Sequence, residues 1–251
     1  MGKKREINCI LNDISKKLNE ECFRISSKFK DVQNYYGLDY LRINQCAKEL
    51  LDTIWGEVGY DIPVDIFRLV EELGIEIISI RLNEEDKEKV NRTVGRMSVR
   101  PNFVTSGKNR CIYIDSESSL FTQRFVVAHE LAHLIMDLEN EDWWTSVEDC
   151  VMPMLPLKIS ELVADSFAIF LLIPMEPFLN VFKRYVDKEG KAGNWPIVTE
   201  DWLRYLSLKV QISYYYVAYA YEQLRYVAYW MYVNRENYPV ITDEIVDMLF
   251  Q

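Results

Sequence analysis

The sequence predicts an α+β fold that is mainly helical and contains a small mixed β-sheet. Apolar residues recur at helical spacing through most of the 251 residues. Segments rich in β-branched residues are short and fall between residues 75 and 115. We expect an N-terminal helical extension (residues 1–40), a central domain (41–190) and a C-terminal helical region (191–251).

The first third of the chain reads as a series of helices. Residues 6–36 have apolar residues at helical spacing, which predicts one or two amphipathic helices whose charged residues face water. A further helix is expected over residues 43–58, with Gly59 as its stop. Pro63 then begins a short helix that Gly74 ends.

The predicted strands follow directly. They cover residues 75–80, 93–100 and 110–115, and a turn is expected around residues 106–109. The charged run at residues 84–89 is most simply a solvated loop. Ser116 to Ser119 then offer an N-cap for the helix that contains both histidines of the chain.

After that helix comes a polar link over residues 139–156 that is too irregular to assign. A helix over residues 158–172 follows and is stopped by Pro174, and another covers residues 177–187. Thr199 is expected to cap the final run of helices.

Composition limits the classes of function. The net charge is −10, with 39 acidic against 29 basic residues, which argues against unaided binding to nucleic acid. Five widely spread cysteines without a CxxC pair favour reduced thiols over a disulfide framework. The first residues lack the apolar stretch of a secretory signal, and no apolar window is long enough to cross a bilayer. We therefore expect a soluble cytoplasmic protein.

The histidines carry the strongest functional signal. His129 and His133 are four residues apart, so a helix places both imidazoles on one face, where they can coordinate the same metal ion. Imidazole suits zinc, and Glu130 follows the first histidine, where it can reach water at that ion. The pattern predicts a zinc-dependent peptidase with Glu130 as its general base; core or surface histidines on an amphipathic helix are the simpler alternative.

A catalytic zinc needs a third protein ligand, and Glu161 is the candidate. Asp165, one helical turn later, would accept a hydrogen bond from a ligating histidine and fix its tautomer. The alternative interpretation is that Glu161 is a solvated residue favoured early in a helix and that Asp165 is a helix-surface residue. Rival carboxylates lie nearer the histidines, namely Asp137, Asp142, Glu148 and Asp149.

Three stretches resemble the ImmA/IrrE family of metallo-endopeptidases: Ala47–Ile80, Cys111–Met136 and Glu161–Pro174. The Arg-Phe pair at residues 124–125 and the Ala-Asp-x-Phe-Ala run from residue 164 are the most specific pieces. The resemblance implies a zincin-like peptidase domain, with His129, His133 and Glu161 as zinc ligands and Glu130 as the base. It also implies a protein substrate, a helix-turn-helix transcriptional repressor that is cut or otherwise inactivated, or a toxin–antitoxin-like pairing.

The C-terminal region looks like the family's helix-turn-helix-like segment, with helices over residues 201–213 and 214–225. A DNA reader would place polar and basic residues at the start of the second helix, whereas this chain has tyrosines at Tyr214, Tyr215, Tyr216 and Tyr219. We therefore expect packing against the peptidase rather than base readout. The aromatic run at residues 226–232 is more typical of core or dimer surface.

Two functional details remain open at this stage. The group that stabilises the oxyanion must be a tyrosine or an arginine, because the chain has no third histidine. The strand at residues 110–115 could hold the substrate backbone as an added strand. The main alternative function is a non-catalytic zinc-containing regulator that binds a repressor or toxin stoichiometrically; a DNA-binding regulator is a third.

Overall fold

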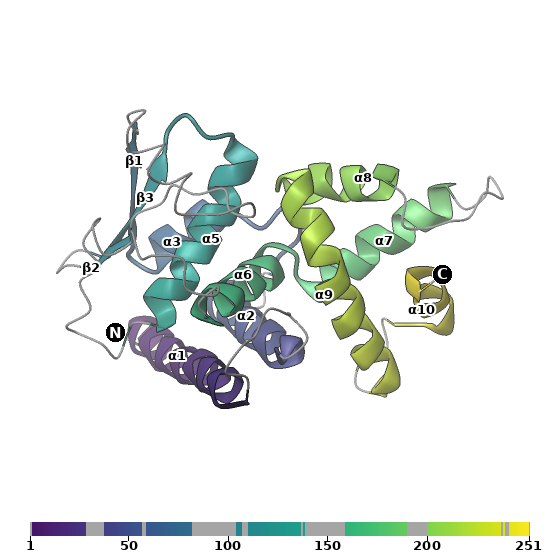
Figure 1. Cartoon of the computed structure of the whole chain (residues 1–251), viewed down its shortest axis with the longest axis horizontal. Coiled ribbons are helices and arrows are strands. Elements are labelled where there is room, and N and C mark those ends of the chain that lie inside the picture. The colour runs from purple at the N-terminus through teal and green to yellow at the C-terminus, as the bar shows by residue number, and fades with distance from the viewer. Residues whose placement is uncertain are drawn as a thin grey trace.

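A computed structural model of the chain confirms the mainly helical α+β class with its small mixed sheet (Figure 1). It describes residues 2–28, 38–56, 59–81, 104–106, 110–136, 138, 159–189, 200–236, 238 and 241–250. The expectations for residues 84–89, 93–100 and 139–156, and for Thr199 as a cap, lie outside the described residues.

The sheet consists of β1 (Glu76–Ile80), β2 (Val104–Ser106) and β3 (Arg110–Asp115), in the order β1-β3-β2. β1 pairs with β3 in parallel and β2 pairs with β3 antiparallel, so the sheet is mixed. Ile112 and Ile114 are buried on one face of β3, and Cys111 and Asp115 are buried on the other, so both faces of the strand are covered over most of its length. The strands expected at residues 75–80 and 110–115 are confirmed, and β2 was missed.

The position of β3 limits the idea that it accepts the substrate as an added strand. β1 pairs along β3 from Cys111 to Asp115, and β2 occupies the opposite edge from Arg110 to Ile112. Both edges of β3 are therefore taken at Cys111 and Ile112. β3 is the central strand, and the expectation of strand addition there is wrong for these two residues.

The predicted boundaries of two helices need correction. α2 (Tyr40–Trp55) ends at Gly56, whose φ is +50°, and not at Gly59. α3 (Ile66–Glu72) begins after Asp65, whose carboxylate accepts the backbone N–H of Arg68; Pro63 precedes it. An acidic side chain that caps the helix thus sets its start more closely than the proline does. Gly74, at φ +74°, lies just past the end of α3, as predicted.

α1 (Gly2–Lys28) is one continuous helix that lies across α2 and the lower end of α5 (Leu120–Met136) (Figure 1). Its apolar stripe of Leu11, Ile14 and Leu18 is buried in the main core. The expectation that its charged residues face water is wrong for Glu21, whose side chain is 1% exposed.

Glu21 is tolerated in the interior because its carboxylate is paired and hydrogen-bonded. Arg24 donates to it at 2.5 and 2.7 Å, and the backbone N–H of Asp39 donates at 2.7 Å. Burial raises the pKa of Glu21, but these hydrogen bonds more than offset burial and hold the pKa below its ordinary value. The contact also joins the end of α1 to the start of α2.

The centre of the molecule is formed by α5 and α6 (Ile159–Leu172), which pack directly against each other. Ser119 caps α5, since its hydroxyl accepts the N–H of Thr122 at 3.2 Å, as predicted. α6 is apolar around most of its surface, which suits a helix enclosed by α1, α2, α5 and α9 (Tyr214–Val233). The predicted helix over residues 158–172 is confirmed.

The remaining described helices lie on the side of α6 away from the sheet (Figure 1). They are α7 (Met175–Glu189), α8 (Glu200–Val210), α9 and α10 (Asp243–Phe250). Trp202 of α8 is fully buried against Phe182 and Tyr185 of α7. No single helix in the described ranges is long and apolar enough to cross a membrane. α6 and α7 reach that length and apolar content only when taken together, and the pair is bent by 60°.

Candidate metal centre

Two helices supply the side chains of the candidate centre. α5 carries His129 and His133, and α6 carries Glu161 in its first turn. Phe125, Val127, Leu131 and Ala132 are buried around α5 and fix its rotation, so that the two histidines face α6. The side chains of His129, His133 and Glu161 keep 10, 20 and 19% of their surface exposed. The site is thus recessed but open.

The three residues converge closely. The Nε2 atoms of His129 and His133 are 3.1 Å apart. Glu161 places Oε2 at 3.4 Å from Nε2 of His129, and Oε1 at 3.5 Å from Nε2 of His133. One ligand atom from each residue can be chosen so that all lie within 4.8 Å of one another. The structure therefore brings together the three residues that the sequence singled out as a group that could hold a metal ion.

Asp165 orients one of the histidines. Its Oδ1 lies 2.7 Å from Nδ1 of His129. Because a carboxylate only accepts, Nδ1 donates the hydrogen bond, which leaves Nε2 as the atom of this ring that faces Glu161 and His133. The sequence placed Asp165 one turn after Glu161 for this role, and the contact has the expected form.

Glu130 follows His129 on α5 and is 6% exposed. Its role as the general base stays a prediction from its place directly after His129. The rival carboxylates Asp137, Asp142, Glu148 and Asp149 lie outside the described residues.

Two contacts of α5 were not foreseen. Tyr216 of α9 stacks on Phe125 with ring centres 3.7 Å apart, and the ring of Phe125 lies 6.3 Å from that of His129. The start of α9 therefore packs against the helix that carries both histidines, in line with the packing role expected for its tyrosines. The sequence indicates only the contact between Phe125 and His129, because residues four apart lie on the same face of a helix.

Arg124 holds the other side of α5. The residue is 5% exposed, and its guanidinium donates to the carbonyl oxygen of Val64 at 2.6 Å. Burial lowers the pKa of Arg124 below its ordinary value, and the negative charge of Asp65 opposes that effect. The arginine joins α5 to the loop before α3, so it serves the position of the helix and is engaged away from the histidines.

Comparison with known proteins agrees with this geometry. No curated protein matches the chain. A family model, Peptidase_M78, described as an IrrE N-terminal-like domain, matches residues 70–219. That range is well over half of the chain and contains α5, α6 and the three converging residues. The chain therefore belongs to the M78 family of metallopeptidases, the family with the IrrE N-terminal-like domain.

Proposed function

We propose that this protein is a zinc-dependent endopeptidase whose metal ligands are His129, His133 and Glu161. One observation carries the proposal, the spacing of the donor atoms. Ligands about 2.0–2.1 Å from a tetrahedral zinc lie about 3.3 Å from one another. The two Nε2 atoms are 3.1 Å apart, and each faces its own oxygen of Glu161, Oε2 at 3.4 Å from His129 and Oε1 at 3.5 Å from His133. With one oxygen chosen, all three donor atoms lie within 4.8 Å of one another.

The donor types support zinc as well. Two imidazoles and one carboxylate form the set found in catalytic zinc sites, which leave a fourth position for water or substrate. The partial exposure of His133 and Glu161 is consistent with such an open position. A structural zinc site would instead be closed by four protein ligands.

The chemistry follows from the residues in place. When bound, zinc would act as a Lewis acid that acidifies water and polarises the scissile carbonyl. Glu130 takes the proton of the attacking water and passes it to the leaving amine. Asp165 keeps Nδ1 of His129 protonated and so keeps Nε2 available as a donor to the metal.

We propose a helix-turn-helix transcriptional repressor as the substrate, which is what the family resemblance implies. The net charge of −10 supports a basic protein partner, because the DNA-binding face of a repressor carries positive charge. The same charge disfavours direct binding to nucleic acid.

The test is to incubate a candidate repressor with the zinc-loaded wild type and with Glu130→Gln. The wild type should cleave it, and mass spectrometry should locate one or a few sites; the variant should retain zinc and lose cleavage about 10²-fold or more. Glu200→Gln, an exposed change on α8, is the matched control and should cleave normally. Equal cleavage by the wild type and Glu130→Gln would remove Glu130 from the role of base.

The same experiment separates the alternative function. A stoichiometric regulator would bind the repressor with equal affinity in both forms and leave it intact after long incubation with zinc. That outcome would replace the peptidase with a zinc-containing binding module.

A further inference from the structure

The last residue of the helix that carries both histidines is hydrogen-bonded from α1. Asn19 donates its side-chain N–H to the carbonyl oxygen of Met136 at 2.8 Å. Ser15, one turn earlier on α1 and fully buried, donates its hydroxyl to the same oxygen at 3.3 Å. Met136 ends α5, so two side chains from a distant part of the chain cap this helix.

Such a cap acts on the turn that contains His133. The last four carbonyls of a helix have no partner within the helix, and a last turn without partners frays. His133 lies in that turn, three residues before Met136. His129 lies a full turn earlier and is oriented by Asp165. The two candidate ligands are thus supported from different sides, one by α6 and the other through the end of α5.

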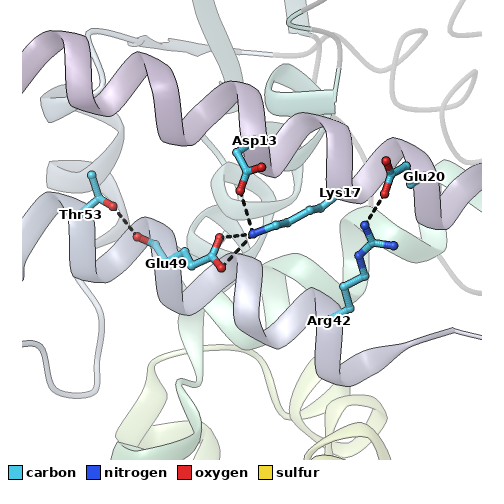
Figure 2. A network of polar contacts seen from close by, with 6 residues as sticks. All are labelled: Asp13, Lys17, Glu20, Arg42, Glu49 and Thr53. Atoms are coloured by element: carbon cyan, nitrogen blue, oxygen red, sulfur yellow. Dashed lines mark hydrogen bonds and ion pairs between the residues drawn. The ribbon is translucent and has the colours of Figure 1, made fainter.

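α1 is itself held firmly enough to provide this support. Figure 2 shows the side that faces α2, where Lys17 contacts Asp13 and Glu49 at 2.8 Å each and Arg42 pairs with Glu20. Burial lowers the pKa of Lys17, but its hydrogen bonds to the two carboxylates outweigh burial and raise that pKa above its ordinary value.

The three functions of α1 fall on three adjacent faces. Its apolar stripe enters the core, its charged stripe contacts α2, and Ser15 with Asn19 contacts α5. Residues four apart share a face, which explains how one helix serves all three neighbours. The positions of Ser15 and Asn19 are therefore fixed from both sides.

We propose that Asn19, together with Ser15, is a positioning residue for the metal centre: it fixes the last turn of α5 and thereby the orientation of His133. The proposal rests on the metal centre described under the proposed function. It assigns a role to a segment that lies outside the range matched by the family.

The test compares zinc affinity in Asn19→Asp, Asn19→Ala and Ser15→Ala/Asn19→Ala, measured by competition with a chromophoric chelator. Aspartate has the shape of asparagine but no N–H to donate, and its charge is unfavourable at a helix C-terminus. Asn12→Ala is the matched control, because Asn12 is exposed on the same helix. We expect the dissociation constant to rise about 5- to 10-fold in the single variants, below the 10- to 100-fold typical of residues that contact a ligand, and further in the double variant.

Two readouts do not depend on catalysis. Amide hydrogen exchange at residues 133–136 should accelerate in the metal-free Asn19 variants relative to Asn12→Ala. The visible spectrum of the cobalt-substituted protein should change, because it reports the ligand geometry. A lower melting temperature with unchanged zinc affinity, exchange and cobalt spectrum would reduce α1 to a structural element and overturn the proposal.

Failure of this inference can be told apart from failure of the proposed function. If the wild type binds one zinc and cleaves but the Asn19 variants match it, the positioning role alone is wrong. If the wild type binds no zinc, both are wrong.

Discussion

Removal of the Asp165 carboxylate should weaken metal binding with little effect on the fold. Asp165→Ala deletes the 2.7 Å contact to Nδ1 of His129, which holds the ring and its tautomer. Losing a carboxylate that orients a ligating histidine costs 10- to 100-fold in metal affinity. The Asp165 side chain is 31% exposed, so solvent already screens the pair and the lower end applies. We expect about a 10-fold rise in the zinc dissociation constant, equivalent to about 1.4 kcal/mol.

Competitive chelator titration measures this change directly. Asp165→Asn should fall between the wild type and alanine, since its amide oxygen can still accept from Nδ1 without the charge. Asp187→Ala removes an exposed carboxylate of α7 and should bind zinc like the wild type. Wild-type affinity in Asp165→Ala would refute the orienting role, and a loss well beyond 100-fold would indicate that Asp165 itself is a ligand.

Two further predictions concern other carboxylates. Glu161→Ala should lower the zinc retained after dialysis, measured by metal analysis, because two imidazoles alone form an incomplete site; unchanged zinc content would point to another carboxylate. Glu21→Gln should cost about 2 kcal/mol at neutral pH, since charged hydrogen bonds to Arg24 are lost. Because the folded-state pKa of Glu21 is lowered, its stabilisation is present above the ordinary pKa of about 4.3 and disappears as pH falls. Melting temperatures of the two proteins should therefore converge as the pH falls through the lowered folded-state pKa of Glu21, and a constant difference would contradict this account.

The convergence of His129, His133 and Glu161 could be predicted because its signal is local. His129 and His133 are related by helix geometry alone, and Asp165 follows Glu161 by the same four-residue period. Each pair needs only one correctly assigned helix. The contact between the pairs is long-range, yet two histidines that lack a third ligand leave few ways to complete a site.

Features that depend on the neighbours of an element were missed. The charge of Glu21 suggests an exposed residue, and its burial depends on the backbone of Asp39, eighteen positions away. The strand character of residues 110–115 was evident, but its central place depends on β2, which is three residues long. Likewise, nothing around Asn19 signals that its partner is the carbonyl of Met136.

The packing of α1 and α2 bears on whether the range matched by the family model could fold as a separate unit. Leu50 and Leu51 of α2 have no exposed surface, and α2 shares an extensive contact with α6, yet the family match begins only at residue 70. A fragment trimmed to the matched range would bare the side of α6 that α1 and α2 cover. The range that the family model matches is thus shorter than the packed core, to which both α1 and α2 contribute.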